Sequence, residues 1–120
     1  MYAERHTVTF VTATGGGATA YTPPVTGRIA AIRYIKATAA VALASTADFT
    51  ITAAETGAAI LSKANVAADF TNAPTQPAHT ATGGVVTGVV RDVVVAGERV
   101  KVDVVAGGNT KQGTIHVVVG

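Results

Sequence analysis

Hydrophobic and polar residues alternate along much of the chain, most regularly toward its C-terminus. Valines alternate with charged residues from Arg99 to Val104, and Ile115, Val117 and Val119 share one face of the segment 114–119. A period of two residues is typical of a β-strand with one buried side. Because the segment 107–113 between them is rich in glycine, residues 91–120 are predicted to form a β-hairpin.

The same alternation predicts further strands at His6–Thr14, Arg28–Lys36, Asp48–Ala53, Ala58–Lys63 and Val85–Val95. Gly88 interrupts the last one, which predicts two short strands or one strongly bent strand. The segment Arg28–Lys36 carries apolar residues on both faces, which favours a central strand or one covered by a partner subunit. Residues 37–46 are interpreted as a loop or a bulged strand, and the turn at 55–57 predicts a second hairpin.

Four prolines mark segments that cannot lie in the middle of a sheet. Pro23 and Pro24 predict an edge segment or an extended connector after Tyr21. Regular structure is expected to thin out over 65–82, where Pro74 and Pro77 favour an extended, polyproline-like arm on the surface. After this arm, a turn is predicted at 96–98.

These elements predict an all-β fold that occupies residues 1–120 as a single domain. About seven or eight short strands, with turn signals roughly every 8 to 12 residues and no helical period, are typical of an antiparallel β-sandwich or jelly roll. A small closed β-barrel is the alternative.

Composition excludes several kinds of covalent cross-link, metal site and binding partner. The chain contains no cysteine, so disulfides and thiolate metal sites are excluded. No apolar run approaches the roughly 20 residues of a membrane helix, and the N-terminus lacks a secretory signal, so synthesis in the cytoplasm is expected. The net charge is +2 and aromatic residues make up 5%. Without basic patches interleaved with aromatic rings, binding of nucleic acid is not expected.

The sequence contains no recognisable motif for catalysis, metal binding or cofactor binding. His6, His79 and His116 lack metal-ligand spacing, and Ser45 and Ser62 lie in no nucleophile motif. The carboxylates are spread over turns and strand starts, and the glycine runs lack the context of a phosphate-binding loop. We therefore predict a protein that is not an enzyme.

Three segments resemble a family of small all-β proteins encoded beside the major capsid protein in tailed bacteriophages and prophages. They are GRIAAIRY at 27–34, DFTIT at 48–52, and GGNTKQGT at 107–114 with its closing strand. The resemblance implies a virion structural protein that decorates or cements the outside of the capsid and stabilises the head. Its implied partners are the major capsid protein and further copies of the chain, as a dimer or trimer. The resemblance implies no catalytic residue.

The alternative function is a binding module on a head fibre, neck or tail that recognises a carbohydrate or a host receptor. Such a module requires a concave platform of aromatic side chains.

Capsid docking is expected to involve the N-terminal segment Met1–His6 and the proline-rich arm 72–79 more than the loop 107–113. The reason is that prolines order the arm in advance, so less freedom is lost on binding. Self-association is expected through Arg28–Lys36 or through edges near Pro23. The candidate interface residues are Glu4, Arg5, His6, Pro23, Pro24, Arg28, Arg33, Pro74, Gln76, Pro77 and His79.

Overall fold

The computed structural model describes residues 3–120, and these form eleven β-strands and no helix. The all-β prediction is confirmed. The strands are β1 (Glu4–Val11), β2 (Ala18–Tyr21), β3 (Val25–Lys36), β4 (Asp48–Ala53), β5 (Ala59–Lys63), β6 (Phe70–Asn72), β7 (Thr75–His79), β8 (Val85–Asp92), β9 (Val94–Glu98), β10 (Val100–Val105) and β11 (Gln112–Val119).

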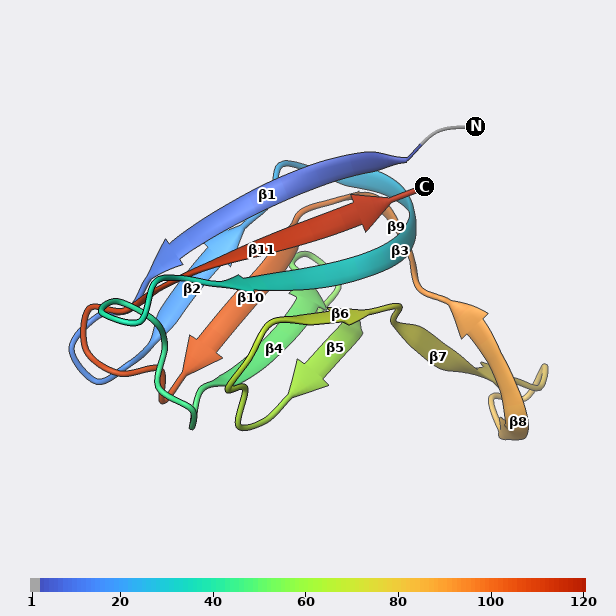
Figure 1. Cartoon of the computed structure of the whole chain (residues 1–120). Coiled ribbons are helices and arrows are strands. Elements are labelled where there is room, and N and C mark those ends of the chain that lie inside the picture. The colour runs from blue at the N-terminus through green and yellow to red at the C-terminus, as the bar shows by residue number, and fades with distance from the viewer. Residues whose placement is uncertain (1–2) are drawn as a thin grey trace.

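Nine of the strands form two sheets, of five and four strands, that face each other (Figure 1). Their orders are β1-β11-β3-β6 and β2-β10-β4-β5, and β9 pairs with the first part of β3. The antiparallel pairs are nested in sequence and alternate between the two sheets: β1 with β11 and β3 with β6 lie in one sheet, and β2 with β10 and β4 with β5 lie in the other. This is the jelly-roll arrangement of a sandwich, as predicted. Among residues 3–120 the two sheets share no ladder, so the closed barrel is not formed.

The predicted C-terminal hairpin is wrong. β10 and β11 are consecutive strands, but β10 pairs with β2 and β4, whereas β11 pairs with β1 and β3. The two strands lie in opposite sheets because each has one valine-rich face, and both faces enter the same buried core. Val100, Val102 and Val104, like Ile115 and Val117, are almost completely buried, so the predicted inward faces are confirmed. The loop 106–111 therefore crosses between the layers.

Hydrogen bonds with Thr12 and Gly16, both buried, fix the position of this loop. The Thr12 hydroxyl, just after β1, donates to the Gly108 carbonyl at 2.6 Å and accepts from the Lys111 amide at 2.7 Å. The Gly107 amide donates to the Gly16 carbonyl at 3.0 Å. A Cβ atom on Gly16 would lie 2.8 Å from the Gly107 nitrogen, so only glycine permits this close approach.

The prediction of two apolar faces on β3 is also wrong. The register against β11 shifts between Ala31 and Ile29, so Ala30 is an extra residue that changes which side the following residues face. As a result Ile29, Ile32 and Tyr34 are all buried, whereas Ile35 is exposed. β3 therefore has a single core face. It lies inside its sheet, between β11 and β6, which agrees with the predicted alternative of a central strand.

An aromatic cluster fills the core beside a glycine. The Phe49 ring packs edge-on against Tyr34 and Phe10, with ring centroids 4.9 and 6.0 Å apart, and Phe70 closes the cluster. Gly113 of β11 lies opposite Phe10 in the sheet. A Cβ atom at Gly113 would be 2.6 Å from Phe10 Cζ and 2.9 Å from Tyr34 Cε1. The absence of a side chain at Gly113 is thus what leaves room for the rings.

The remaining predictions of local structure are partly confirmed. The hairpin of β4 and β5 and the loop at 37–46 are present as predicted. Residues 85–98 form two strands, β8 and β9, so the predicted turn at 96–98 is instead the end of β9. β2 and β6 were not predicted, because they are only four and three residues long.

Gly113→Ala is expected to lower the free energy of unfolding by about 1 to 3 kcal/mol, because the added methyl group overpacks rigid rings. Urea denaturation measures this loss. The matched control is Gly17→Ala, where the nearest atom to the added Cβ is 3.7 Å away, and its effect should stay within about 0.5 kcal/mol. Equal effects of the two substitutions would contradict this account of the core.

Tyr34 is expected to make stability fall at alkaline pH. Burial, and secondarily the Asp69 carboxylate, raise the pKa of the Tyr34 phenol above its usual 10.0. Its contribution is therefore complete below the unfolded-state pKa and is lost as pH rises through the folded-state pKa. Urea denaturation across this range should show a steeper decline for the native sequence than for Tyr34→Phe. Parallel pH profiles would contradict the prediction.

Candidate interaction surface

Most charged side chains of residues 3–120 form hydrogen bonds or ion pairs within the chain. Within residues 3–120 no three His, Asp or Glu side chains are grouped to hold a metal ion. Six of the seven Asp and Glu side chains form a hydrogen bond or an ion pair within the chain: Asp48 with the Asn65 amide, Glu55 with Arg99, Asp69 with the Lys36 amide, Asp92 with Arg28, Glu98 with the Thr56 amide, and Asp103 with both Thr19 and Lys101. The seventh, Glu4, lies 3.6 Å from His6 Nε2. The same part of the chain contains no helix long and apolar enough to cross a membrane.

The most distinctive surface is a two-stranded ribbon, β7 with β8, which projects from one end of the sandwich (Figure 1). It belongs to neither large sheet. At its tip the Thr80 amide donates to the Gly84 carbonyl at 2.8 Å, and the Gly84 amide donates to the Thr80 hydroxyl at 3.1 Å. The predicted polyproline-like arm is therefore wrong in conformation, since residues 75–79 form a hydrogen-bonded strand.

Pro77 sets the shape of the ribbon. It lies opposite Val90, whereas its neighbour Ala78 lies opposite Val86, so three residues of β8 bulge out between them. Pro77 has no amide to donate to a ladder, and Gly88 at the centre of the bulge adopts a φ of 79°. The bulge widens the ribbon into an open groove of about 410 Å³, lined by Pro77, Val85, Val86, Val89 and Val90 among others.

The base of the ribbon is anchored in the sandwich. Val93 and Val95, which follow β8, are 4% and 2% exposed and belong to the core. The Ile29 amide donates to the Val93 carbonyl at 2.9 Å, and Arg28 forms an ion pair with Asp92 at 3.5 Å. Pro74, predicted to lie on an exposed arm, is instead buried at the entrance to β7. The ribbon therefore leaves a fixed base.

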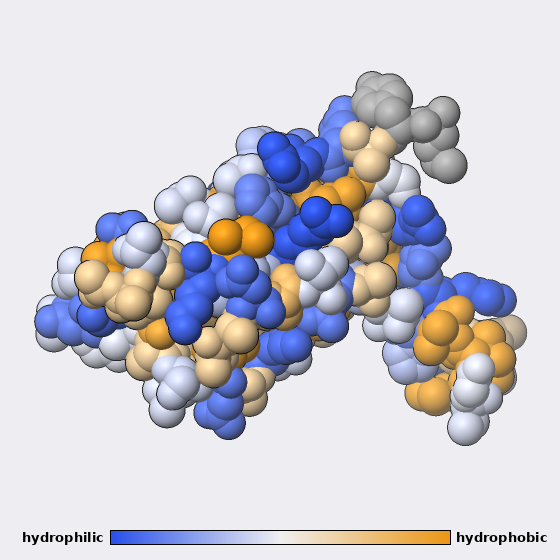
Figure 2. Space-filling model, in the orientation of Figure 1, coloured by the Kyte–Doolittle hydropathy of each residue, from blue (hydrophilic) through white to orange (hydrophobic). Residues whose placement is uncertain are grey.

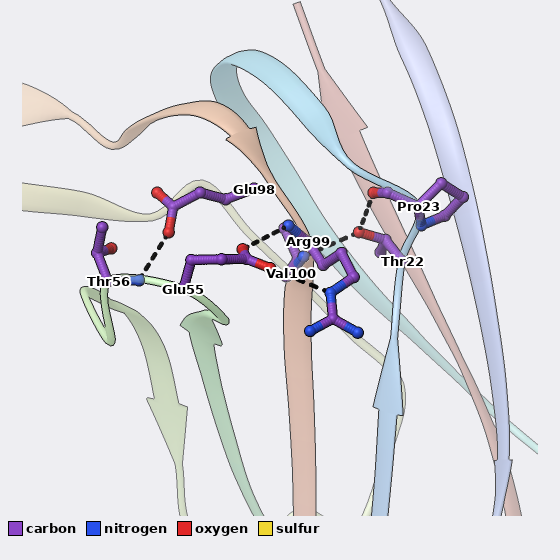
Figure 3. Close-up of polar contacts among 7 residues, drawn as sticks. All are labelled: Thr22, Pro23, Glu55, Thr56, Glu98, Arg99 and Val100. Atoms are coloured by element: carbon purple, nitrogen blue, oxygen red, sulfur yellow. Dashed lines mark hydrogen bonds and ion pairs between the residues drawn. The ribbon is translucent and has the colours of Figure 1, made fainter.

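A cluster of polar contacts fixes the chain where it returns from the ribbon into β10 (Figure 3). The Glu55 carboxylate accepts from the Arg99 amide at 3.1 Å and from its Nε at 3.2 Å, and Glu98 accepts from the Thr56 amide at 2.8 Å. The buried Thr22 hydroxyl accepts from the Val100 amide at 2.9 Å. These contacts tie the β4-β5 turn and the end of β2 to the start of β10.

The ribbon exposes apolar side chains that the body leaves uncovered. Val85 is 63% exposed and Val90 58%, and Val89 is also exposed. Figure 2 shows hydrophobic atoms gathered on this projection, next to the more mixed surface of the sandwich. We name Pro77, Val85, Val86, Val89 and Val90 the apolar ribbon face. Contiguous apolar surface of this kind marks a site of interaction.

The candidate interface residues fall in separate places. Met1 and Tyr2 of the N-terminal segment lie outside the described residues, and Glu4, Arg5 and His6 form the start of β1, paired with β11. Pro23 and Pro24 are exposed between the second and third strands, and Arg33 is exposed on β3. Only Gln76, Pro77 and His79 lie on the ribbon, with Arg28 and Pro74 at its base.

Sequence reasoning missed the valines of β8. They belong to a run, Val85–Val95, that looks like an ordinary buried strand. The available signal was Pro77: a proline opposite such a run prevents a continuous ladder, so the run cannot be central in a sheet.

Comparisons with protein-family models, curated protein sequences and solved structures found no significant match. They therefore give no support to the family resemblance noted in the sequence. Function has to be argued from the surface itself.

The apolar ribbon face is expected to contribute little to the stability of the isolated chain. Val93→Ala, at the buried base, should lower the free energy of unfolding by about 2 kcal/mol, whereas Val90→Ala on the ribbon should change it by less than about 0.5 kcal/mol. The two substitutions remove the same atoms, so urea denaturation compares the sites directly. A large loss for Val90→Ala would mean that the ribbon face is part of the core.

Proposed function

We propose that the chain is a non-enzymatic structural protein of a virion, which binds the outside of a capsid shell as a decoration or cement protein. In this role the major capsid protein is its partner, and the apolar ribbon face is the docking surface. Further copies of the chain, as a dimer or trimer, complete the assembly.

The observation that carries the proposal is the apolar ribbon face on a fixed base. Val85 and Val90 stay 63% and 58% exposed within their own chain, and Val89 lies with them on the projecting strand pair. Their burial against a second protein would contribute roughly 1.5 to 3 kcal/mol for each fully covered side chain. The bulge at Gly88 also interrupts the β8 edge, which disfavours uncontrolled edge-to-edge pairing.

The narrower assignment to a phage head rests on the resemblance of the segments 27–34, 48–52 and 107–114. The jelly roll is compatible with it, since viral capsid proteins use this fold, but so do lectins. Fold alone therefore does not choose between a shell protein and a binding module.

The alternative, a module for a carbohydrate or host receptor, has less support. Among the described aromatic residues Phe10, Tyr34 and Phe49 are buried, and Phe70 is partly buried. Tyr21 is exposed, but the Arg99 guanidinium lies over its ring at 4.4 Å. The described surface thus offers no group of stacked rings for a sugar.

The test uses particles of the virus that encodes the chain, stripped of it and then incubated with purified protein. Val85→Thr with Val90→Thr keeps β-branched side chains but removes apolar surface, so occupancy on the particles is expected to fall roughly tenfold. The control is Val11→Thr with Val105→Thr, which changes two similarly exposed valines on the sandwich and should decorate normally.

Occupancy is measured by gel densitometry, and electron cryomicroscopy locates the bound chain. Density on the outer shell with the ribbon toward the capsid protein supports the proposal. Normal decoration by the ribbon variant would disprove the ribbon as docking surface. Density confined to fibres, neck or tail would favour the receptor-binding alternative.

A further inference from the structure

A second surface of different chemistry lies on the sheet β1-β11-β3-β6. Residues that alternate with the core positions point away from the sandwich, and we name the following set the outer sheet face: Arg5, Thr7 and Thr9 of β1, Thr114, His116 and Val118 of β11, Arg33 and Ile35 of β3, and Thr71 of β6. This face combines hydroxyl groups with positive charge.

Two arginines, Arg5 and Arg33, lie on this face, and none of its named residues is acidic. His116 lies directly opposite Arg33 on one side and opposite Thr7 on the other, and its Nδ1 is 3.1 Å from the Thr7 hydroxyl. Arg5 lies opposite Val118, two residues along β11 from His116.

The free cations of the described chain concentrate on this face. Six of the nine lysines and arginines contact an acceptor: Arg28, Lys36, Lys63, Arg99, Lys101 and Lys111. The side chains of Arg5, Arg33 and Arg91 make no hydrogen bond or ion pair with residues 3–120. Two of these three lie on the outer sheet face. No carboxylate of residues 3–120 forms an ion pair with Arg5 or Arg33.

We propose that the outer sheet face binds an acidic protein surface, with Arg5 and Arg33 as the charged contacts. Guanidinium groups form paired hydrogen bonds with carboxylates, and the threonine hydroxyls between them add neutral donors. The described face carries no exposed aromatic ring on which bases could stack, so protein carboxylates fit it better than single-stranded nucleic acid. This inference does not depend on the capsid role, because it concerns another surface and another chemistry.

The test is a titration of the isotope-labelled full chain, followed by two-dimensional NMR, with hexaglutamate as the probe. Hexaglutamine is the uncharged control of equal length, and oligothymidylate of six nucleotides represents nucleic acid. Hexaglutamate is expected to shift amide signals of β1, β11 and β3 and not those of β7 and β8. Because the contacts are exposed, roughly 0.3 M salt should abolish the shifts.

Single-charge variants identify the arginines. Arg5→Gln and Arg33→Gln are each expected to weaken hexaglutamate binding roughly two- to fivefold, the range for exposed ion pairs. Arg91→Gln removes the same charge from the ribbon and should leave binding unchanged, while thermal melts confirm that all three variants fold. Equal weakening by all three would show attraction by net charge alone and overturn the proposal. So would shifts from hexaglutamine, no shifts from hexaglutamate, or tighter binding of the oligothymidylate.

Discussion

The structure depends on the contact between β10 and β11 across the core. Each strand has one face of small branched residues, and Val100, Val102 and Val104 share a buried cluster with Ile115 and Val117. Had the two strands paired edge to edge, both apolar faces would lie on one side of a single sheet. Placing them in opposite layers instead gives each face a partner, and it recruits β1 and β3 on one side and β2 and β4 on the other. The loop 106–111 therefore connects the two layers of the sandwich. Its hydrogen bonds with Thr12 and Gly16 fix the position of this connection.

Much of the local structure could be predicted from the sequence, because the period of two is a property of neighbouring residues. The inward positions of β10 and β11, and the hairpin of β4 with β5, follow from alternation and turn residues alone. Pairing across the sheets could not be predicted in this way. Alternation looks the same in a hairpin and in two facing layers, and the extra residue Ala30 in β3 has no signature of its own. Prediction therefore failed where distant segments, rather than neighbours, decide the outcome.

The candidate surface shows the same division. The prolines correctly marked 72–79 as different from a central strand, and Gln76, Pro77 and His79 do lie on the projection. The partner strand, β8, was not recognised as part of this projection because its valines resemble core residues. Its pairing with β7, Val90 opposite Pro77, places these valines on the projection, where they are exposed. The outer sheet face was equally hidden, since Arg5, Arg33 and His116 are far apart along the chain and meet only through the register of three strands. The molecule thus presents one apolar and one cationic surface on separate elements.

The pairing of the first strand with the last also governs the order of events during folding. Thr7 and His116, which touch across this pair, are 109 positions apart in the chain. Contacts between such distant residues must first overcome the entropy of closing a long loop, so folds dominated by them form slowly. The hairpins of β4 with β5 and β7 with β8 can form early, because their strands are near neighbours. β1 has no partner in its sheet until β11 has left the ribosome. Closing the sandwich thus requires synthesis as far as β11.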